Sequence, residues 1–258
     1  MWSRRRLVRY LVSADLKKKG ADTLLGNVWW VLDPLLQMLV YVVLVSIIFA
    51  RPQPDYPLFI FAAILPWKWF TSSIQDSISS VTSQERLIKQ LQFPKIVLPT
   101  AAAGAGVVNF GFGLVALAGL LLLFYRDRVT VELLLIPAIA VVQLAFTLAL
   151  ALAASAVNVF YRDIGNLARH ALRLWFYLSP SLWGAAQLEQ LAASHPTMAT
   201  IAQLNPFYIL FTAYRDVIYF GRAPNWTSLI ALLGVSLGLI GLAIFFFKRL
   251  EPSFAKVL

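Results

Sequence analysis

The sequence predicts an all-α integral membrane protein. It has six transmembrane helices, an N-terminal amphipathic interface helix and a short external re-entrant helix before the last span. Three observations support this fold class. Of the 258 residues, 60 % are hydrophobic and only 13 % are charged, whereas soluble domains carry about 25 % charged residues. The apolar residues form runs near the length of about 20 residues that a helix needs to cross a bilayer. The basic residues gather between alternate runs.

The first segment, residues 1–27, is predicted to be a cytoplasmic helix that lies on the membrane surface. Leu7, Leu11 and Ala14 recur at helical spacing between two basic clusters. This pattern gives one apolar face, flanked by cations that attract anionic lipid headgroups. A cleavable signal peptide does not fit, because Arg9 interrupts the apolar stretch and no small-residue cleavage site follows. A disordered basic tail is the alternative.

Six apolar runs are predicted to cross the membrane. They cover residues 28–50, 58–81, 97–125, 133–160, 172–188 and 229–247. A polar cytoplasmic segment, 84–96, joins the second and third spans. Before the last span, Asn205-Pro206 is typical of a helix start and Gly221 of a helix end. We therefore expect a short external helix over 205–221 that enters the membrane without crossing it, with an exposed surface loop as the alternative.

The basic residues predict the orientation. Of the 22 lysines and arginines, seven lie in residues 1–27, and three each in 84–96, in 161–173 and after the last span. These sixteen fall on one side of the predicted topology; five lie in the alternate loops, and Lys68 lies inside a span. The positive-inside rule places both termini in the cytoplasm. The net charge of +10 is thus explained by topology, and no separate basic domain indicates nucleic-acid binding.

Several kinds of chemistry are excluded or disfavoured. The chain has no cysteine, so disulfides and thiolate metal sites are excluded, and its two histidines are far apart. It has no phosphate-binding loop and no nucleophile-elbow or zinc-protease signature. We therefore expect a chain that is not an enzyme and binds no metal or cofactor, and a separate subunit as the energy source for any driven transport.

Polar residues recur at helical spacing within three of the spans. The members of these stripes are Asp33, Gln37 and Tyr41 in the first span, Lys68, Ser72, Gln75 or Asp76, and Ser79 in the second, and Gln143, Thr147 and Asn158 in the fourth. Polar groups inside spans face a protein interior or an aqueous path. Helix packing is the favoured interpretation for the fourth span, and an aqueous path for the second, because packing does not explain its many hydroxyls.

Four segments, in this order along the chain, resemble the membrane subunit of type-2 ABC exporters, in particular the branch that exports O-antigen and related lipid-linked glycans. They are Leu25–Leu35, Phe93–Pro99, Val159–Ile164, and Asn205–Phe207 with Tyr214–Asp216. The resemblance implies a homodimer in the bacterial inner membrane with a conduit between its two copies. It also implies two separate ATPase subunits, which bind ATP and magnesium, and a lipid-linked polysaccharide as the substrate.

The resemblance also implies roles for individual residues. The coupling segment that contacts the ATPase comprises Glu85, Arg86, Leu87, Ile88, Lys89 and Leu91, with Arg162 and Asp163 beside it. The residues implied to line the conduit are Tyr41, Trp67, Lys68, Trp69, Phe70, Trp175, Phe176, Tyr177 and Trp183. An interfacial belt is the alternative for these aromatic residues. Arg4, Arg5 and Arg6 are implied to attract the lipid headgroup.

Three other functions stay open. The same kind of permease could carry teichoic acid, capsule or a hydrophobic drug, although the hydroxyl-rich second span favours a polar polymer. A membrane enzyme acting on a lipid-linked glycan would need a carboxylate or histidine cluster at one interface, which the sequence does not contain. A secondary carrier is disfavoured by the lack of paired carboxylates within the spans.

Overall fold

The computed structural model describes residues 12–13, 26–48, 54–90, 93–182 and 192–257. Within these ranges the secondary structure is helical and contains no strand, so the predicted all-α class is confirmed. The longer helices are α2 (Trp29–Val42), α3 (Tyr56–Ser80), α4 (Glu85–Gln90), α5 (Val97–Phe124), α6 (Ile136–Phe160), α7 (Ile164–Leu178), α9 (Pro196–Leu204), α10 (Pro206–Ile218) and α11 (Trp226–Val257). A π-helical stretch, Val43–Ile48, extends α2.

Five helical stretches of the described chain are long and apolar enough to cross a membrane: Trp29–Ser46, Tyr56–Ser80, Val97–Phe124, Val131–Phe160 and Trp226–Phe254. They match the first four predicted spans and the last one. In the region of the fifth, α7 begins at Ile164 and ends at Leu178, whereas the sequence predicts residues 172–188. Residues 183–191 and most of the predicted N-terminal helix lie outside the described ranges. The count of six spans therefore stays a prediction.

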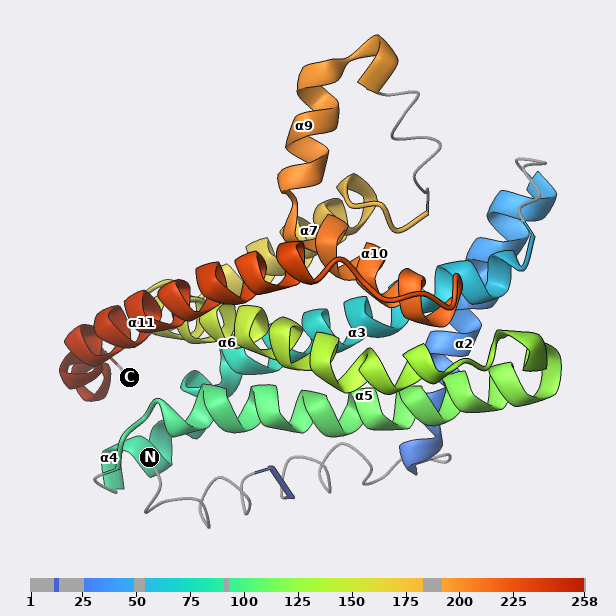
Figure 1. Cartoon of the computed structure of the whole chain (residues 1–258). Coiled ribbons are helices and arrows are strands. Elements are labelled where there is room, and N and C mark those ends of the chain that lie inside the picture. Colours follow the sequence, from blue (N-terminus) through green and yellow to red (C-terminus); the bar gives the residue numbers. More distant parts are fainter. Residues whose placement is uncertain (1–11, 14–25, 49–53, 91–92, 183–191, 258) are drawn as a thin grey trace.

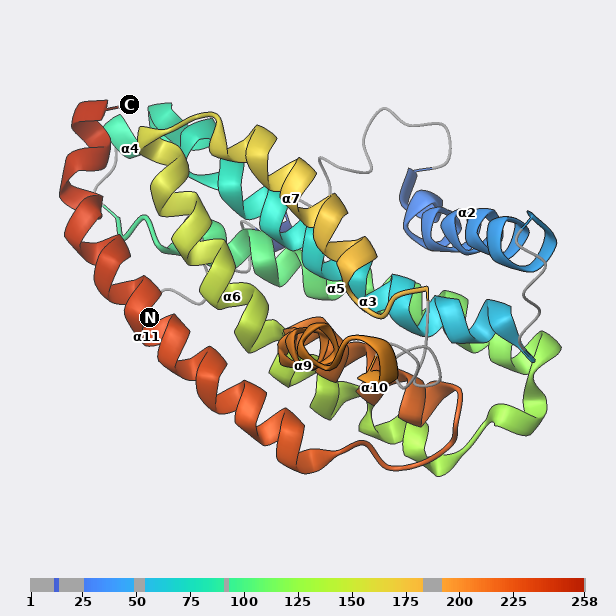
Figure 2. The same ribbon diagram turned by 90° about the horizontal axis from the view of Figure 1, so that it is seen from above.

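The helices α3, α5, α6 and α11 run alongside one another, and α2 crosses α3 and α5 at a steep angle (Figure 1). The helix α4, the turn between α6 and α7, and the C-terminus lie at one end of this bundle, which we call the inner end. The connection between α5 and α6 lies at the opposite, outer end. Viewed from above, α7 lies along α3 on the same side as α2 (Figure 2).

The centre of the bundle is α3, which packs against α2, α5, α6, α7 and α10. Gly106 of α5 allows a close approach to α3, because a Cβ atom at this position would overlap the Ser73 hydroxyl. On the opposite side, Gln143 Nε2 donates to the Pro66 carbonyl at 2.8 Å and Asn158 Nδ2 to the Ile78 carbonyl at 2.9 Å. The polar stripe of α6 thus joins two helices, as the packing interpretation predicts.

The predicted helix over 205–221 is observed as α10. The Asn205 side chain caps it by accepting from the backbone N–H of Phe207 at 3.0 Å, and Gly221 ends the segment with a φ of +63°. The Phe207 ring contacts Trp67, near the middle of α3, at a centroid distance of 4.7 Å. Tyr219, just beyond α10, contacts Phe59 at the outer end of α3 at 5.4 Å. The helix therefore spans only the outer half of the bundle. The preceding helix, α9, was not predicted from the sequence.

Candidate functional site

The polar stripe of α3 lies on the side of the helix that its neighbours leave open. Lys68, Ser72, Gln75 and Ser79 are partly or fully exposed, whereas the residues between them, such as Phe70, Ser73 and Ile74, are buried. Ser72 donates its hydroxyl proton to the Trp69 carbonyl at 3.1 Å. Its oxygen keeps lone pairs that can accept from a ligand or from water. The stripe therefore presents acceptors and a cation.

The polar stripes of α2 and α3 meet at an ion pair. The Lys68 ammonium donates to the Asp33 carboxylate, and the side chains are 30 % and 60 % exposed, respectively. Both charged groups lie within helices long enough to cross a membrane. Because hydrocarbon would strongly disfavour such exposed charges, this location indicates a water-filled or protein-covered environment.

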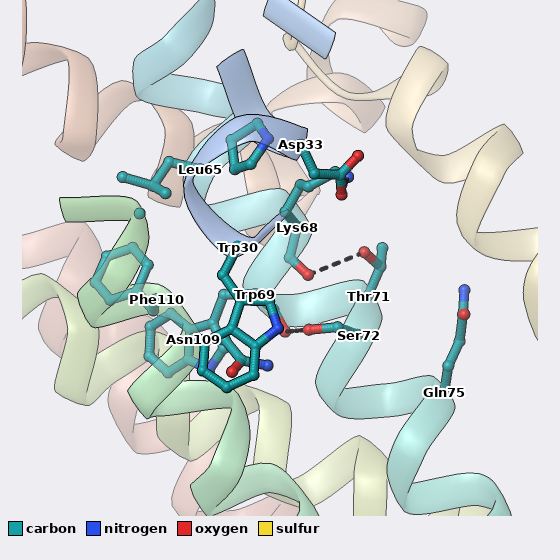
Figure 3. Close-up of a pocket in the computed structure, with 12 residues that line it drawn as sticks. Trp30, Asp33, Leu65, Lys68, Trp69, Thr71, Ser72, Gln75, Asn109 and Phe110 are labelled. Atoms are coloured by element: carbon teal, nitrogen blue, oxygen red, sulfur yellow. Dashed lines mark hydrogen bonds and ion pairs between the residues drawn. The ribbon is translucent and has the colours of Figure 1, made fainter. Parts of the chain in front are cut away.

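A pocket of about 350 Å³ opens beside this ion pair, between α2, α3 and α5 (Figure 3). The aromatic rings of Trp30, Trp69 and Phe110 gather on one side, and Lys68 and Asp33 lie on another. Two of the lining residues also carry a buried polar atom without a partner in the described part of the chain: Trp69 Nε1, a donor, and Asn109 Oδ1, an acceptor. Aromatic faces next to the exposed charged groups of Lys68 and Asp33 match a ligand that carries both C–H faces and hydroxyl groups.

The helix α7 has two different exposed surfaces. Asn166, Arg169, His170 and Arg173 form a polar surface, followed by the exposed ring of Tyr177. Beside it lies an apolar surface, made of Leu167, Leu174 and Leu178. The third side of the helix, with Leu172 and Phe176, is buried against the bundle.

The contacts of α7 show how deep its arginines lie. Near the start of α7, a Cβ atom on Gly165 would lie 3.7 Å from the Ile78 side chain, and further along, the Trp175 ring meets Phe70 at 5.7 Å. Arg173 is therefore close to the level of Phe70, which lies about 15 Å from the inner end of α3 at 1.5 Å per residue. Exposed guanidinium groups at this depth are incompatible with a lipid-facing surface.

The polar surface of α7 adjoins the stripe of α2. Tyr41 lies close to Gln37 and to Tyr177, and its ring contacts Phe176 at 5.6 Å. We use the name polar face for the combined surface of the three helices. It comprises Asp33 and Gln37 of α2, Lys68, Ser72, Gln75 and Ser79 of α3, and Asn166, Arg169, His170, Arg173 and Tyr177 of α7. Tyr41, which was also implied to line the conduit, is buried.

Most aromatic residues implied to line a conduit pack inside this chain. Trp67, Phe70 and Phe176 are almost completely buried, and Trp175 is partly buried. They surround Phe207 of α10, whose ring lies 4.7 Å from Phe70 and 5.3 Å from Trp175. Trp69 stacks on Phe110 at 4.6 Å. Tyr177 is 53 % exposed, and Trp183 lies outside the described residues. The lining role of this set stays a prediction.

The predicted coupling segment contains α4, at the inner end. Glu85 and Lys89 form an ion pair at 2.7 Å, which lowers the pKa of the Glu85 carboxyl group, and Arg86 is exposed. Ile88 is buried in a second hydrophobic core of this chain, and Leu91 lies outside the described residues. Arg162 and Asp163 are exposed at the same end. The backbone N–H of Lys95 donates to Glu251 at 2.6 Å, which ties the segment to α11.

Two sets of side-chain hydrogen bonds, made by Arg215 and by Asn205, were not predicted from the sequence. Arg215, one of the five basic residues assigned to the alternate loops, is buried and donates to the carbonyls of Pro180 and Ser181 at 2.5 Å each, and of Phe59 at 3.3 Å. Burial lowers the pKa of this guanidinium group. Asn205 donates to Ser179. Both links hold the end of α7 against α10. The arginine within the otherwise apolar run of α10 was the sequence signal that could have indicated the first link.

These features define a multi-span helical membrane protein with an exposed, charged face at the depth of its long apolar helices. Residues 6–219 match the family described as "ABC-2 type transporter", and the chain belongs to this family. It is 33 % identical to the "O-antigen export system permease protein RfbA" of Myxococcus xanthus, over 99 % of this chain and 96 % of that protein. It is 26 % identical to a Klebsiella pneumoniae protein with the same name, over 98 % of this chain and 95 % of that protein.

Proposed function

We propose that this chain is the channel-forming permease subunit of an ATP-driven transporter that exports O-antigen-type, lipid-linked polysaccharide across the bacterial inner membrane. The relatives' names support this cargo. The observation that carries the proposal is the polar face, because its exposed Arg169 and Arg173 lie at membrane depth, where only water or a polar partner is tolerated. A transmembrane conduit for a hydrophilic polymer provides that environment.

The chemistry of the polar face suits a sliding chain. Hydroxyl, amide and charged groups line it at helical spacing, and Tyr177 adds an exposed ring. Many weak contacts of this kind hold a glycan without fixing one register, so that the chain continues to move. The pocket beside Asp33 and Lys68 is large enough to receive a sugar ring from the face.

A second copy of the chain would enclose the conduit. The polar face is flanked by exposed apolar residues, namely Leu36, Leu39 and Val40 of α2 and Leu167, Leu174 and Leu178 of α7. Such residues can pack between two copies through van der Waals contacts, which drive helix association in membranes, and this packing leaves the polar residues on the inside. The transporter is accordingly a homodimer.

A separate ATPase subunit would drive transport from the inner end, with ATP and magnesium bound on that subunit. In this arrangement α4 offers Glu85, Arg86 and Lys89, and the turn before α7 offers Arg162 and Asp163. The hydrogen bond from Lys95 to Glu251 would carry a displacement of this segment to α11. Both termini would be cytoplasmic, and Arg4, Arg5 and Arg6 would meet the lipid headgroups.

The test is deletion of the gene from its native cell, followed by complementation. The proposal predicts that surface polysaccharide disappears, that lipid-linked polysaccharide accumulates inside, and that the wild-type chain restores export. Gentle extraction should yield the chain together with an ATPase subunit. Surface polysaccharide that persists in the deletion strain would refute the proposed cargo. Reproducible purification without an ATPase would refute the transporter mechanism.

A further inference from the structure

The charges of the polar face are unevenly distributed. The helices α2, α3 and α7 together carry three permanent cations, Lys68, Arg169 and Arg173, and two carboxylates, Asp33 and Asp76. Lys68 is matched by Asp33 across the two helices. No acidic residue lies within α7 itself, which adds His170 to its two arginines. The inner half of the face is therefore cationic on its α7 side.

Arg169 and Arg173 are not neutralised by the part of the chain that the structure describes. Arg169 donates to the neutral amide oxygen of Asn166, and no ion pair is described for Arg173. The two arginines are four residues apart on one helix, so their Cβ atoms are about 6 Å apart and their like charges repel. Two exposed guanidinium groups held together on one helix face offer a place where an anion can bind between them.

A guanidinium group binds the oxygens of a phosphate through two parallel N–H donors, which a lysine cannot do. Two such groups on one helix face offer enough donors for the oxygens of one phosphate or of a diphosphate. Asn166 lies about one turn before Arg169. Its side-chain oxygen accepts from the Arg169 guanidinium group and so orients it.

We propose that Arg169 and Arg173 form an anion site for a phosphate or diphosphate group on the inner half of the polar face. The site rests on the proposed function in one respect, because it needs that face to be open to water. Either a phosphorylated lipid headgroup or free phosphate would satisfy the chemistry. The site lies on α7, whereas the pocket beside Lys68 lies between α2, α3 and α5.

The test measures binding by the purified transporter in detergent. The probes are farnesyl diphosphate, inorganic pyrophosphate and farnesol, and the readout is tryptophan fluorescence, since Trp175 lies on the same helix. The loss of even one charge-assisted hydrogen bond weakens binding by about tenfold or more, so the Arg169→Gln/Arg173→Gln variant should bind farnesyl diphosphate at least about tenfold more weakly. Arg126→Gln, at the exposed outer end, is the matched control and should bind normally. Lysine at both positions should restore part of the affinity.

The three probes distinguish the source of the anion. Tighter binding of farnesyl diphosphate than of pyrophosphate supports a lipid headgroup, and equal binding of both supports free phosphate. Unchanged affinity in the double glutamine variant, or equal binding of farnesol, overturns the site. If the variant instead separates the two copies in native mass spectrometry while its diphosphate affinity is unchanged, the arginines pair with the second copy and the proposal is wrong.

These outcomes are separate from those of the deletion experiment. Loss of diphosphate binding in the double variant supports the anion site even where deletion leaves surface polysaccharide unchanged. Conversely, a deletion strain that lacks surface polysaccharide, together with a double variant that binds diphosphate normally, overturns the site and leaves the export function intact.

Discussion

The Asn205 side-chain amide donates to the Ser179 hydroxyl at 2.9 Å, and this bond joins two breaks in the helical structure. Ser179 directly follows the end of α7, and Asn205 lies between α9 and α10. The Asn205 Oδ1 atom also accepts from Trp175 Nε1 and from the backbone N–H of Phe207, both at 3.0 Å. One amide thus satisfies polar groups at a depth where water is scarce, and it fixes the start of α10 against the end of α7.

Replacing Asn205 by leucine should destabilise the protein strongly. The substitution removes a helix cap, worth about 1 kcal/mol, and leaves the Trp175 N–H without its partner, which costs about 1–3 kcal/mol more. Thermal unfolding in detergent measures the change. Asn225→Leu is the matched control, because Asn225 caps α11 at an exposed position and has only the cap to lose. Equal losses in the two variants would show that the link to Ser179 and Trp175 contributes nothing.

Replacing Arg215 by an apolar residue of similar length should lower the stability of the protein. Arg215→Met leaves the carbonyls of Pro180 and Ser181 without their donor, and buried groups without partners cost about 1–3 kcal/mol each. We expect a clearly lower unfolding temperature and partial recovery in Arg215→Lys, which keeps one donor group. Arg126→Met, at an exposed position, serves as the control. A stable Arg215→Met variant would show that the end of α7 is held by other contacts.

Two glycines of α5 should respond oppositely to alanine. At Gly106 an added methyl group would overlap the Ser73 hydroxyl and crowd Trp69, so α3 and α5 would have to separate. Overpacking of this kind costs about 1–3 kcal/mol. At Gly119 nothing lies within 4 Å of an added methyl group, and alanine improves helix propensity by up to about 1 kcal/mol. The unfolding temperature should fall for Gly106→Ala and stay level or rise for Gly119→Ala.

Substitutions of Trp67 and Tyr177 should distinguish a residue that packs the core from a residue that lines the conduit. Trp67 is 6 % exposed within the aromatic core, so Trp67→Ala should lower stability by about 3–5 kcal/mol. Tyr177 is exposed on the polar face, and Tyr177→Ala should leave the unfolding temperature nearly unchanged while it slows polysaccharide export. Normal export by a stable Tyr177→Ala variant would remove this ring from the conduit lining.

Residue patterns could predict the long spans and the polar stripes. The start of α10 followed from the cap at Asn205, and the packing role of Gln143 and Asn158 followed from their helical spacing. The predicted fifth span began too late, because Arg169, His170 and Arg173 lower the hydropathy of a segment that is helical from Ile164 onward. Hydropathy cannot recognise a helix that exposes charges to water at membrane depth.

Other features depend on contacts between distant residues. The family resemblance placed Trp67 and Phe70 among lining residues, but both are buried against Phe207, which approaches from another helix. Arg215 is buried because the carbonyls at the end of α7 and at Phe59 converge on it. Ile88 is likewise buried by residues that are distant in sequence, such as Phe247 and Phe254 of the second core. Periodicity shows which residues share a face and cannot show which neighbour covers it.

The central claim is that the polar face lines an aqueous conduit, and cysteine labelling tests it most directly, because the chain has no native cysteine. Single cysteines would replace Gln75 and Arg173 on the polar face, and Val141 and Leu237 on exposed apolar surfaces of α6 and α11. We expect a charged, water-soluble thiol reagent to modify the first pair in native membranes and to leave the second pair unmodified. Modification of Val141→Cys and Leu237→Cys with protection of Gln75→Cys and Arg173→Cys would contradict it.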